Sequence, residues 1–241
     1  MPAPPNSQAG SLFARVLGIV HSPRITFEAV ARAPRWFGVV ALTFLVTTGC
    51  TAILLETAVG QLALLDQWER TMSAFGQTID DVQYAAMEDA SQNGAAYAGL
   101  ISLASGPLLA VGLSGLFFGI FRAAAPSVVT YRQVLAVVAH AGVILALRQV
   151  IAAPITYARE TLGSPMTMGV FFTMLNEASW PARFFGILDL FVIWWIMVLA
   201  VGMSVLYGRP ARRLAGVFVG AYVVALAVVL AVVMAMTGGT A

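Results

Sequence analysis

Long uncharged stretches dominate the hydropathy pattern of the chain, and the short segments between them hold almost all of its charges. A helix needs about 20 mostly apolar residues to cross the hydrocarbon core of a bilayer, which is about 30 Å thick. Five stretches reach that length. They predict an all-α, polytopic integral membrane protein whose membrane domain covers residues 36–236, with spans over about 36–56, 96–121, 133–152, 184–207 and 214–236.

The segment before the first span divides into two parts. Residues 1–10 contain three prolines, which predicts a disordered tail. In residues 11–35, apolar positions share a helical face on each side of Ser22 and Pro23, a pair typical of a helix start. We therefore expect two short, basic amphipathic helices on the cytoplasmic side. They lie either on the lipid headgroups or against the inner face of the protein's own helix bundle.

Two further apolar segments lie between the predicted spans. Apolar residues recur at three- and four-residue steps from Leu62 to Phe75, which predicts an amphipathic helix after the first span. It lies on the outer membrane surface or forms a partner surface. The run from Met166 to Leu175 is too short to span, so it is either an interfacial segment or a re-entrant pore element.

The distribution of arginines predicts the orientation, because basic residues near a span are retained in the cytoplasm. Three arginines follow the odd-numbered spans: Arg70, Arg159 and Arg183. Nine lie on the opposite side: Arg15, Arg24, Arg32, Arg35, Arg122, Arg132, Arg209, Arg212 and Arg213. The N-terminus is therefore expected in the cytoplasm and the C-terminus outside.

Composition excludes several kinds of chemistry. Hydrophobic residues make up 60% of the 241 residues and charged residues 10%, and the sequence contains no lysine. A single cysteine, Cys50, and two histidines, His21 and His140, do not provide a thiolate or multi-histidine metal centre. We expect a non-enzymatic protein without metal or cofactor. Nucleic-acid binding is not expected either, because the basic residues follow the predicted inner side of the membrane.

Four polar residues fall within or at the ends of the predicted spans. Charges in hydrocarbon are costly, so they usually pair or face water. Arg148, Asp189 and Glu56 all lie toward the predicted outer leaflet, and an Arg148–Asp189 pair, joined by Glu56, would lower their desolvation cost. Such a pair either fixes the register of the third and fourth spans or forms a substrate or proton site. His140 either bonds a neighbouring carbonyl or relays protons.

Two predicted spans each contain a pair of glycines four residues apart, a step that allows helix backbones to approach closely. The second span carries Gly112, Gly115 and Gly119, and the fifth carries Gly216 and Gly220. They are expected to pack helices within the bundle or to form a contact between subunits of a homo-oligomer.

The fourth span contains the sequence Ile-Leu-Asp-Leu-Phe-Val-Ile-Trp, of which the motif residues are Leu188, Asp189, Leu190, Phe191 and Trp194. Leu-Ala-Val-Gly at 199–202 and the basic loop 209–213 follow it, and the N-terminal segment contains 22–27 and 33–36. Together these resemble the bacterial branch of the Yip family, named for interaction with Ypt/Rab GTPases. The resemblance implies five spans and a cytoplasmic N-terminus.

The Asp-Leu-Tyr-Gly-Pro motif and the long N-terminal domain of the eukaryotic members are absent, so the resemblance does not imply Rab binding. The exclusive use of arginine resembles the codon bias of a GC-rich bacterial genome and favours the bacterial cytoplasmic (inner) membrane. We expect a scaffold or adaptor that binds other membrane proteins or organises lipid through residues 11–33. The alternative is a small transporter or channel that uses Arg148 and Asp189.

Overall fold

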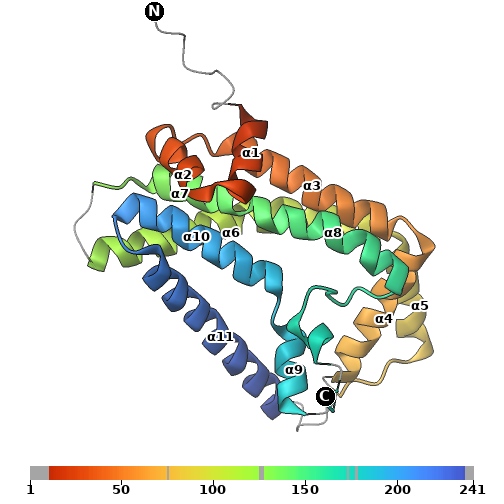
Figure 1. Ribbon diagram of the computed structural model, residues 1–241. Coiled ribbons are helices and arrows are strands. Elements are labelled where there is room, and N and C mark those ends of the chain that lie inside the picture. The colour runs from red at the N-terminus through yellow and green to blue at the C-terminus, as the bar shows by residue number, and fades with distance from the viewer. Residues whose placement is uncertain (1–10, 75, 125–127, 173, 177–178, 237–241) are drawn as a thin grey trace, which may run out of the picture. The chain divides into compact units, whose positions relative to one another are not determined.

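The computed structural model describes residues 11–74, 76–124, 128–172, 174–176 and 179–236, and these residues are mostly helical (Figure 1). The predicted disordered tail lies outside the described residues. The elements are α1 (Leu12–His21), α2 (Pro23–Arg32), α3 (Phe37–Leu55), α4 (Ala58–Ala74), α5 (Asp81–Gln92), α6 (Gly94–Ala124), α7 (Tyr131–Ala141), α8 (Val143–Arg159), η2 (Met168–Phe171), α9 (Trp180–Ile187), α10 (Leu190–Tyr207) and α11 (Ala211–Met236).

Five of these helical stretches are long and apolar enough to cross a membrane: α3, α6, α7 with α8, α10 and α11. The prediction of an all-α protein with five spans is therefore confirmed. The third stretch runs from Tyr131 to Arg159, further than the predicted 133–152, and Gly142 separates α7 from α8 within it. The fourth is shorter than predicted, because residues 184–187 belong to the separate helix α9.

The chain forms two compact units. Unit 1 comprises residues 1–45, 103–147 and 192–219, and unit 2 comprises residues 46–102, 148–191 and 220–241. Each of the five long stretches contributes residues to both units. The charges divide unevenly, because unit 1 holds nine of the thirteen arginines but only one of the eleven carboxylates, Glu28.

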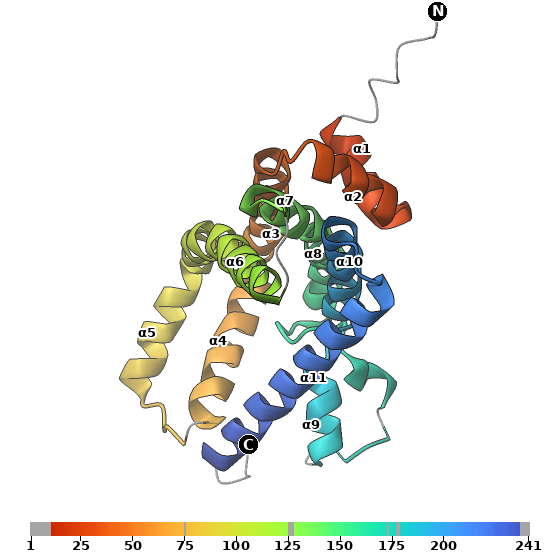
Figure 2. The same ribbon diagram turned by 90° about the vertical axis from the view of Figure 1, so that its left-hand side faces the viewer.

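In unit 1, α1 and α2 pack against α7 (Figure 1 and Figure 2). The side chains of Ile19, Phe27 and Val30 are buried. The two helices approach closely where Gly18 faces Thr26, since a Cβ at Gly18 would collide with the Thr26 hydroxyl. The side-chain amide of Gln133 on α7 donates a 3.0 Å hydrogen bond to the Ala31 carbonyl, which ties the end of α2 to α7.

The core of unit 1 also contains the close contact of α10 with α7 and α2. A Cβ at Gly202 would collide with the Val137 side chain and lie 3.1 Å from the Phe27 ring. Val137, Phe27 and Met203 are fully buried. Gly202 therefore provides the close packing that a larger residue would prevent.

In unit 2, α4 and α5 lie side by side (Figure 2). The predicted amphipathic helix is α4, in which Leu65 is buried whereas Leu62 is exposed. The polar helix α5 was not predicted. Its start is stabilised by a reciprocal capping box, in which Asp80 accepts from the Gln83 backbone and the Gln83 side chain accepts from the Asp80 backbone.

The five glycines expected to pack helices within the bundle do not do so. A Cβ built at Gly112, Gly115, Gly119, Gly216 or Gly220 meets no atom within 4 Å among the described residues. α6 and α11 meet through the rings of Phe117, Phe121 and Phe218 and not through these glycines, so the prediction of close packing within the chain is wrong at these positions. The alternative contact between subunits stays a prediction.

Candidate functional site

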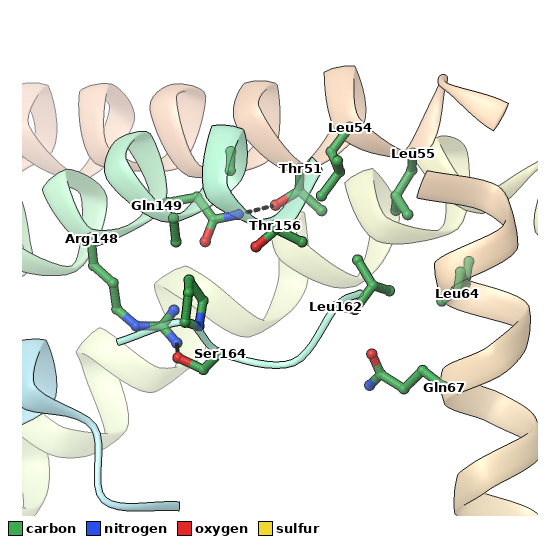
Figure 3. A pocket seen from close by; sticks show the side chains of 13 residues that line it. Thr51, Leu54, Leu55, Leu64, Gln67, Arg148, Gln149, Thr156, Leu162 and Ser164 are labelled. Atoms are coloured by element: carbon green, nitrogen blue, oxygen red, sulfur yellow. Dashed lines mark hydrogen bonds between the residues drawn. The ribbon is translucent and has the colours of Figure 1, made fainter. Parts of the chain in front are cut away.

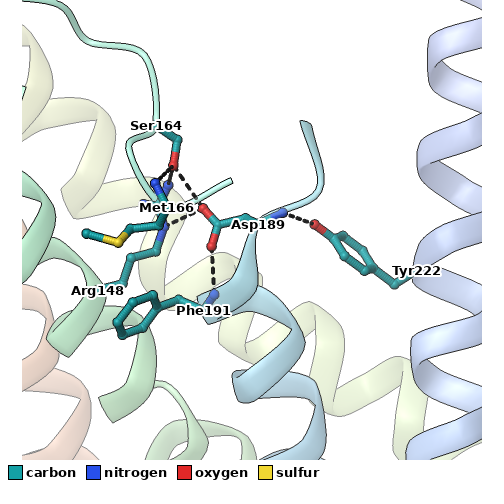
Figure 4. Close-up of polar contacts among 6 residues, drawn as sticks. All are labelled: Arg148, Ser164, Met166, Asp189, Phe191 and Tyr222. Carbon is teal, nitrogen blue, oxygen red and sulfur yellow. Dashed lines mark hydrogen bonds and ion pairs between the residues drawn. The ribbon is translucent and has the colours of Figure 1, made fainter. Parts of the chain in front are cut away.

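Three side chains of unit 2, Arg148, Ser164 and Asp189, form a connected polar cluster (Figure 4). Arg148 Nε donates to Asp189 Oδ2 at 2.8 Å, and Arg148 Nη2 donates to Ser164 Oγ at 2.9 Å. Ser164 Oγ in turn donates to Asp189 Oδ2 at 3.0 Å. Arg148 and Asp189 are thus brought together as expected, and Ser164 closes a triangle between them.

Asp189 occupies a different place from the one predicted. It was expected inside the fourth span, but it lies in the break between α9 and α10. Its Oδ1 accepts a 2.8 Å hydrogen bond from the Phe191 backbone N–H. An aspartate at this position satisfies a backbone donor that the first turn of a helix leaves free. Asp189 therefore acts as the cap of α10 as well as the partner of Arg148.

A short backbone pairing holds this break in place. The Met168 N–H donates to the Leu188 carbonyl at 2.8 Å, and the Leu190 N–H donates to the Met166 carbonyl at 3.0 Å. The predicted interfacial or re-entrant run thus begins as an extended segment against residues 188–190 and continues into η2. The Asp189 N–H lies 3.4 Å from the Tyr222 hydroxyl oxygen, which accepts from it (Figure 4).

The loop after α8 carries Ser164 back to Arg148. It starts at Glu160, whose φ of 52° lies in the left-handed region. This conformation costs about 1–2 kcal/mol for a residue other than glycine. It ends α8 and reverses the chain, so that Ser164 contacts a residue of the helix that the chain has just left.

A cavity of about 270 Å³ adjoins the cluster within unit 2 (Figure 3). Its polar lining comes from Thr51, Gln67, Arg148, Gln149, Thr156 and Ser164, and four leucines line it as well: Leu54, Leu55, Leu64 and Leu162. Gln149 on α8 donates a 3.0 Å hydrogen bond to the Thr51 hydroxyl on α3. The cavity therefore has both a hydrogen-bonding wall and an apolar wall.

The hydrogen bonds decide which partner of the pair faces a ligand. The Asp189 carboxylate accepts from Arg148, Ser164 and the Phe191 backbone, and Asp189 is 6% exposed. The described contacts of Arg148 use two of its five N–H groups, and its side chain is 26% exposed. The carboxylate is therefore buried and hydrogen-bonded, whereas N–H donors of the guanidinium can reach a ligand.

Glu56 and His140 do not join the cluster. Glu56 follows the end of α3 and is exposed, and no described contact links it to Arg148 or Asp189, so the expected third member is absent. His140 lies in unit 1, fully buried, with Nδ1 2.7 Å from the Ala136 carbonyl oxygen. Of the two alternatives for His140, a bond to a neighbouring carbonyl or a proton relay, this contact is the first.

Ser164, Tyr222 and the polar cavity residues other than Arg148 were not predicted from the sequence. Their hydrogen bonds join segments from 16 to 98 residues apart. Neither hydrophobic periodicity nor a motif predicts a contact between segments so far apart. The sequence did contain one signal for the helix start at Asp189, because an aspartate before an apolar helix is a typical N-cap.

Among the residues that the structure describes, no three His, Cys, Asp or Glu side chains gather as metal ligands would. A family model described as the Yip1 domain matches residues 17–234. No curated protein and no solved structure matches the chain.

Proposed function

Because the chain belongs to the family defined by the Yip1 domain, we propose that it is a non-enzymatic membrane protein that binds other membrane proteins or organises lipid. We place its contact surface on α1 and α2. This α1–α2 contact surface consists of the apolar residues Phe13, Leu17 and Ile25 and the arginines Arg24 and Arg32. The proposal puts the surface in the cytoplasm of a bacterium, at its inner membrane.

The observation that carries the proposal is the two-faced nature of α1 and α2. One face packs on α7, whereas Phe13, Leu17 and Ile25 remain 69%, 45% and 70% exposed. Scattered apolar residues are normal on a surface, but here they accompany Arg24 and Arg32 on helices fixed to the protein. Exposed apolar and basic side chains together suit a headgroup layer or the juxtamembrane segment of a partner.

The charge distribution supports the orientation. Unit 1 holds nine of the thirteen arginines, and unit 2 holds ten of the eleven carboxylates. Basic residues near spans are retained inside, so unit 1 contains the cytoplasmic ends of the helices in our proposal. Reporter fusions after Thr130 and Ala211 should report cytoplasm, and fusions after Gln83 and Ala241 should report the exterior. A cytoplasmic reporter signal after Ala241 would overturn this topology.

A photocrosslinking pull-down from native membranes tests the function. A photoreactive amino acid at Phe13 or Ile25 should form reproducible adducts with the same membrane protein or lipid. The same group at Val82, which is 78% exposed in unit 2, is the matched control and should not form those adducts. Identical adduct patterns at all three sites, or no reproducible adduct at Phe13 and Ile25, would contradict the proposal.

A further inference from the structure

The cavity beside the polar cluster has the properties of a site for an amphiphile. We propose that it binds the phosphate headgroup of a membrane phospholipid, with Arg148 as the phosphate ligand and the leucines in contact with the first part of the acyl chains. The residues of this site differ from those of the α1–α2 contact surface, so the two proposals can fail separately.

The first argument is electrostatic. Arg148 is the one charged residue among the described residues that line the cavity. Its partner Asp189 does not line the cavity, and the carboxylate already accepts hydrogen bonds from Arg148, Ser164 and the Phe191 backbone. A guanidinium with free N–H groups is suited to phosphate oxygens, because its planar fork forms two parallel charge-assisted hydrogen bonds.

The ion pair with Asp189 also orients Arg148 for this role. Nε is held by Asp189 and one Nη2 proton by Ser164, so the guanidinium plane is fixed before a ligand arrives. A side chain that is already ordered loses less conformational entropy on binding. Neutral donors in the side chains of Gln67, Gln149 and Thr156 line the same cavity and are suited to the remaining headgroup oxygens.

The second argument concerns the source of the phosphate. Free phosphate is hydrophilic throughout and would gain nothing from the wall formed by Leu54, Leu55, Leu64 and Leu162. A phospholipid gains from both walls, because burial of its apolar part is favourable. The volume of about 270 Å³ is slightly below the usual range of small-molecule pockets, about 300–1,000 Å³, and suits a headgroup better than a whole lipid.

Two variants remove the site in different ways. Ala153→Phe fills the cavity from α8, and Ala158→Phe places the same ring on an exposed position of α8 outside the cavity as its matched control. The double variant Arg148→Gln and Asp189→Asn removes the cation without leaving an unpaired charge. Gel filtration checks that each variant is folded, and a variant that elutes at the same volume as the wild type is a valid test of the proposal.

The measurement is native mass spectrometry of the purified full chain with added phosphatidylglycerol, with dioleoylglycerol as the lipid without phosphate. Wild type and Ala158→Phe should retain one phosphatidylglycerol. Ala153→Phe and the double variant should lose the bound population by at least tenfold. Retention of phosphatidylglycerol by both site variants, or equal retention of dioleoylglycerol by the wild type, would overturn the proposal.

Inorganic phosphate distinguishes the two sources of the anion. Millimolar phosphate should not displace phosphatidylglycerol from the wild type. Complete displacement, with phosphate bound in its place, would assign the site to a free anion and overturn the lipid proposal. Adducts formed at Phe13 and Ile25 report on the other surface, so a failure here leaves that result intact.

Discussion

Arg15 in unit 1 and Arg148 in unit 2 are both partly buried, but the two units satisfy them differently. Arg15 Nη1 donates to the Arg35 carbonyl at 3.2 Å, and its buried Nε has no hydrogen-bond partner among the described residues. Burial and the positive charge of Arg35 lower the pKa of Arg15. Arg148, by contrast, has a carboxylate at 2.8 Å and a hydroxyl at 2.9 Å.

The difference separates two uses of arginine in one chain. In unit 2 the partly buried Arg148 is neutralised by Asp189 of the same chain, so this ion pair contributes to the stability of the fold as well as to the proposed binding site. Unit 1 holds nine arginines and one carboxylate, Glu28, which pairs with Arg24, so the counter-charges of the other eight must come from outside the unit. Substitutions in the cluster should therefore change folding first, and those in the α1–α2 contact surface should change binding first.

The largest effect is expected at the ion pair. Arg148→Ala or Asp189→Ala leaves the other charge buried and unpaired, which costs about 3–5 kcal/mol. The double alanine variant should recover most of this stability, except for about 1 kcal/mol from the lost cap of α10. The folded yield in membranes and the thermal unfolding temperature in detergent measure the loss in the single variants and the recovery in the double variant. If the two single losses simply add in the double variant, the pair is not coupled.

Packing rather than pairing should dominate stability in unit 1, and Gly202 tests this. Gly202→Ala places a Cβ against Val137 and Phe27, and overpacking of this kind costs about 1–3 kcal/mol. Gly115→Ala is the control on α6, where the added Cβ meets no neighbour within 4 Å. Thermal unfolding should separate the two. Equal unfolding temperatures would show that α10 moves aside without cost.

A smaller effect is expected for binding at Arg32, which is exposed on α2. Each arginine near an anionic surface contributes about 1 kcal/mol, so Arg32→Ala should lower the local preference for anionic lipid about fivefold. A fluorophore at Leu17→Cys in a Cys50→Ser background, quenched by spin-labelled phosphatidylglycerol or phosphatidylcholine in proteoliposomes, measures that preference. Arg70→Ala, which breaks an ion pair with Asp66 in unit 2, should leave it unchanged.

The smallest effect is expected from Glu28→Gln. Its 3.4 Å ion pair with Arg24 is exposed, and such i,i+4 pairs stabilise a helix by about 0.3–0.5 kcal/mol. The unfolding temperature should stay within error of the wild type. A loss as large as that of Arg148→Ala would mean that unit 1 also depends on a pair within the chain, and the contrast between the units would fail.

The number of spans was readable from the sequence because the bilayer sets a minimum length for each. Apolar runs near 20 residues, two of them interrupted by one charge, predicted five spans, and the described residues contain five helical stretches of this kind. Helix α5 was not predicted because six of its twelve residues are polar and three of the others are alanine, although Asp80 and Gln83 have the spacing of a capping box. Periodicity detects a helix by its apolar face, and a helix with few large apolar residues is recognised mainly by its caps.

The site was only half readable, for a different reason. The cost of a charge among apolar residues pointed to Arg148 and Asp189, and the contact is present. The same argument placed Asp189 inside a helix, since composition alone does not distinguish a charge in mid-helix from one that caps a helix start. Glu56, Gly115 and the other glycines needed knowledge of which surfaces face one another. That knowledge depends on contacts between segments distant in sequence.

The uneven division of charge has an electrical consequence. In the proposed orientation, the arginines of residues 15–35, 122–132 and 209–213 stay on the cytoplasmic side, and the carboxylates of residues 66–89 reach the exterior. A membrane potential that is negative inside attracts the first group and repels the second outward. Each charge is worth about 2.3 kcal/mol per 100 mV. An energised membrane would thus hold the chain in one orientation by its field, and a chain inserted upside down would be opposed at almost every loop.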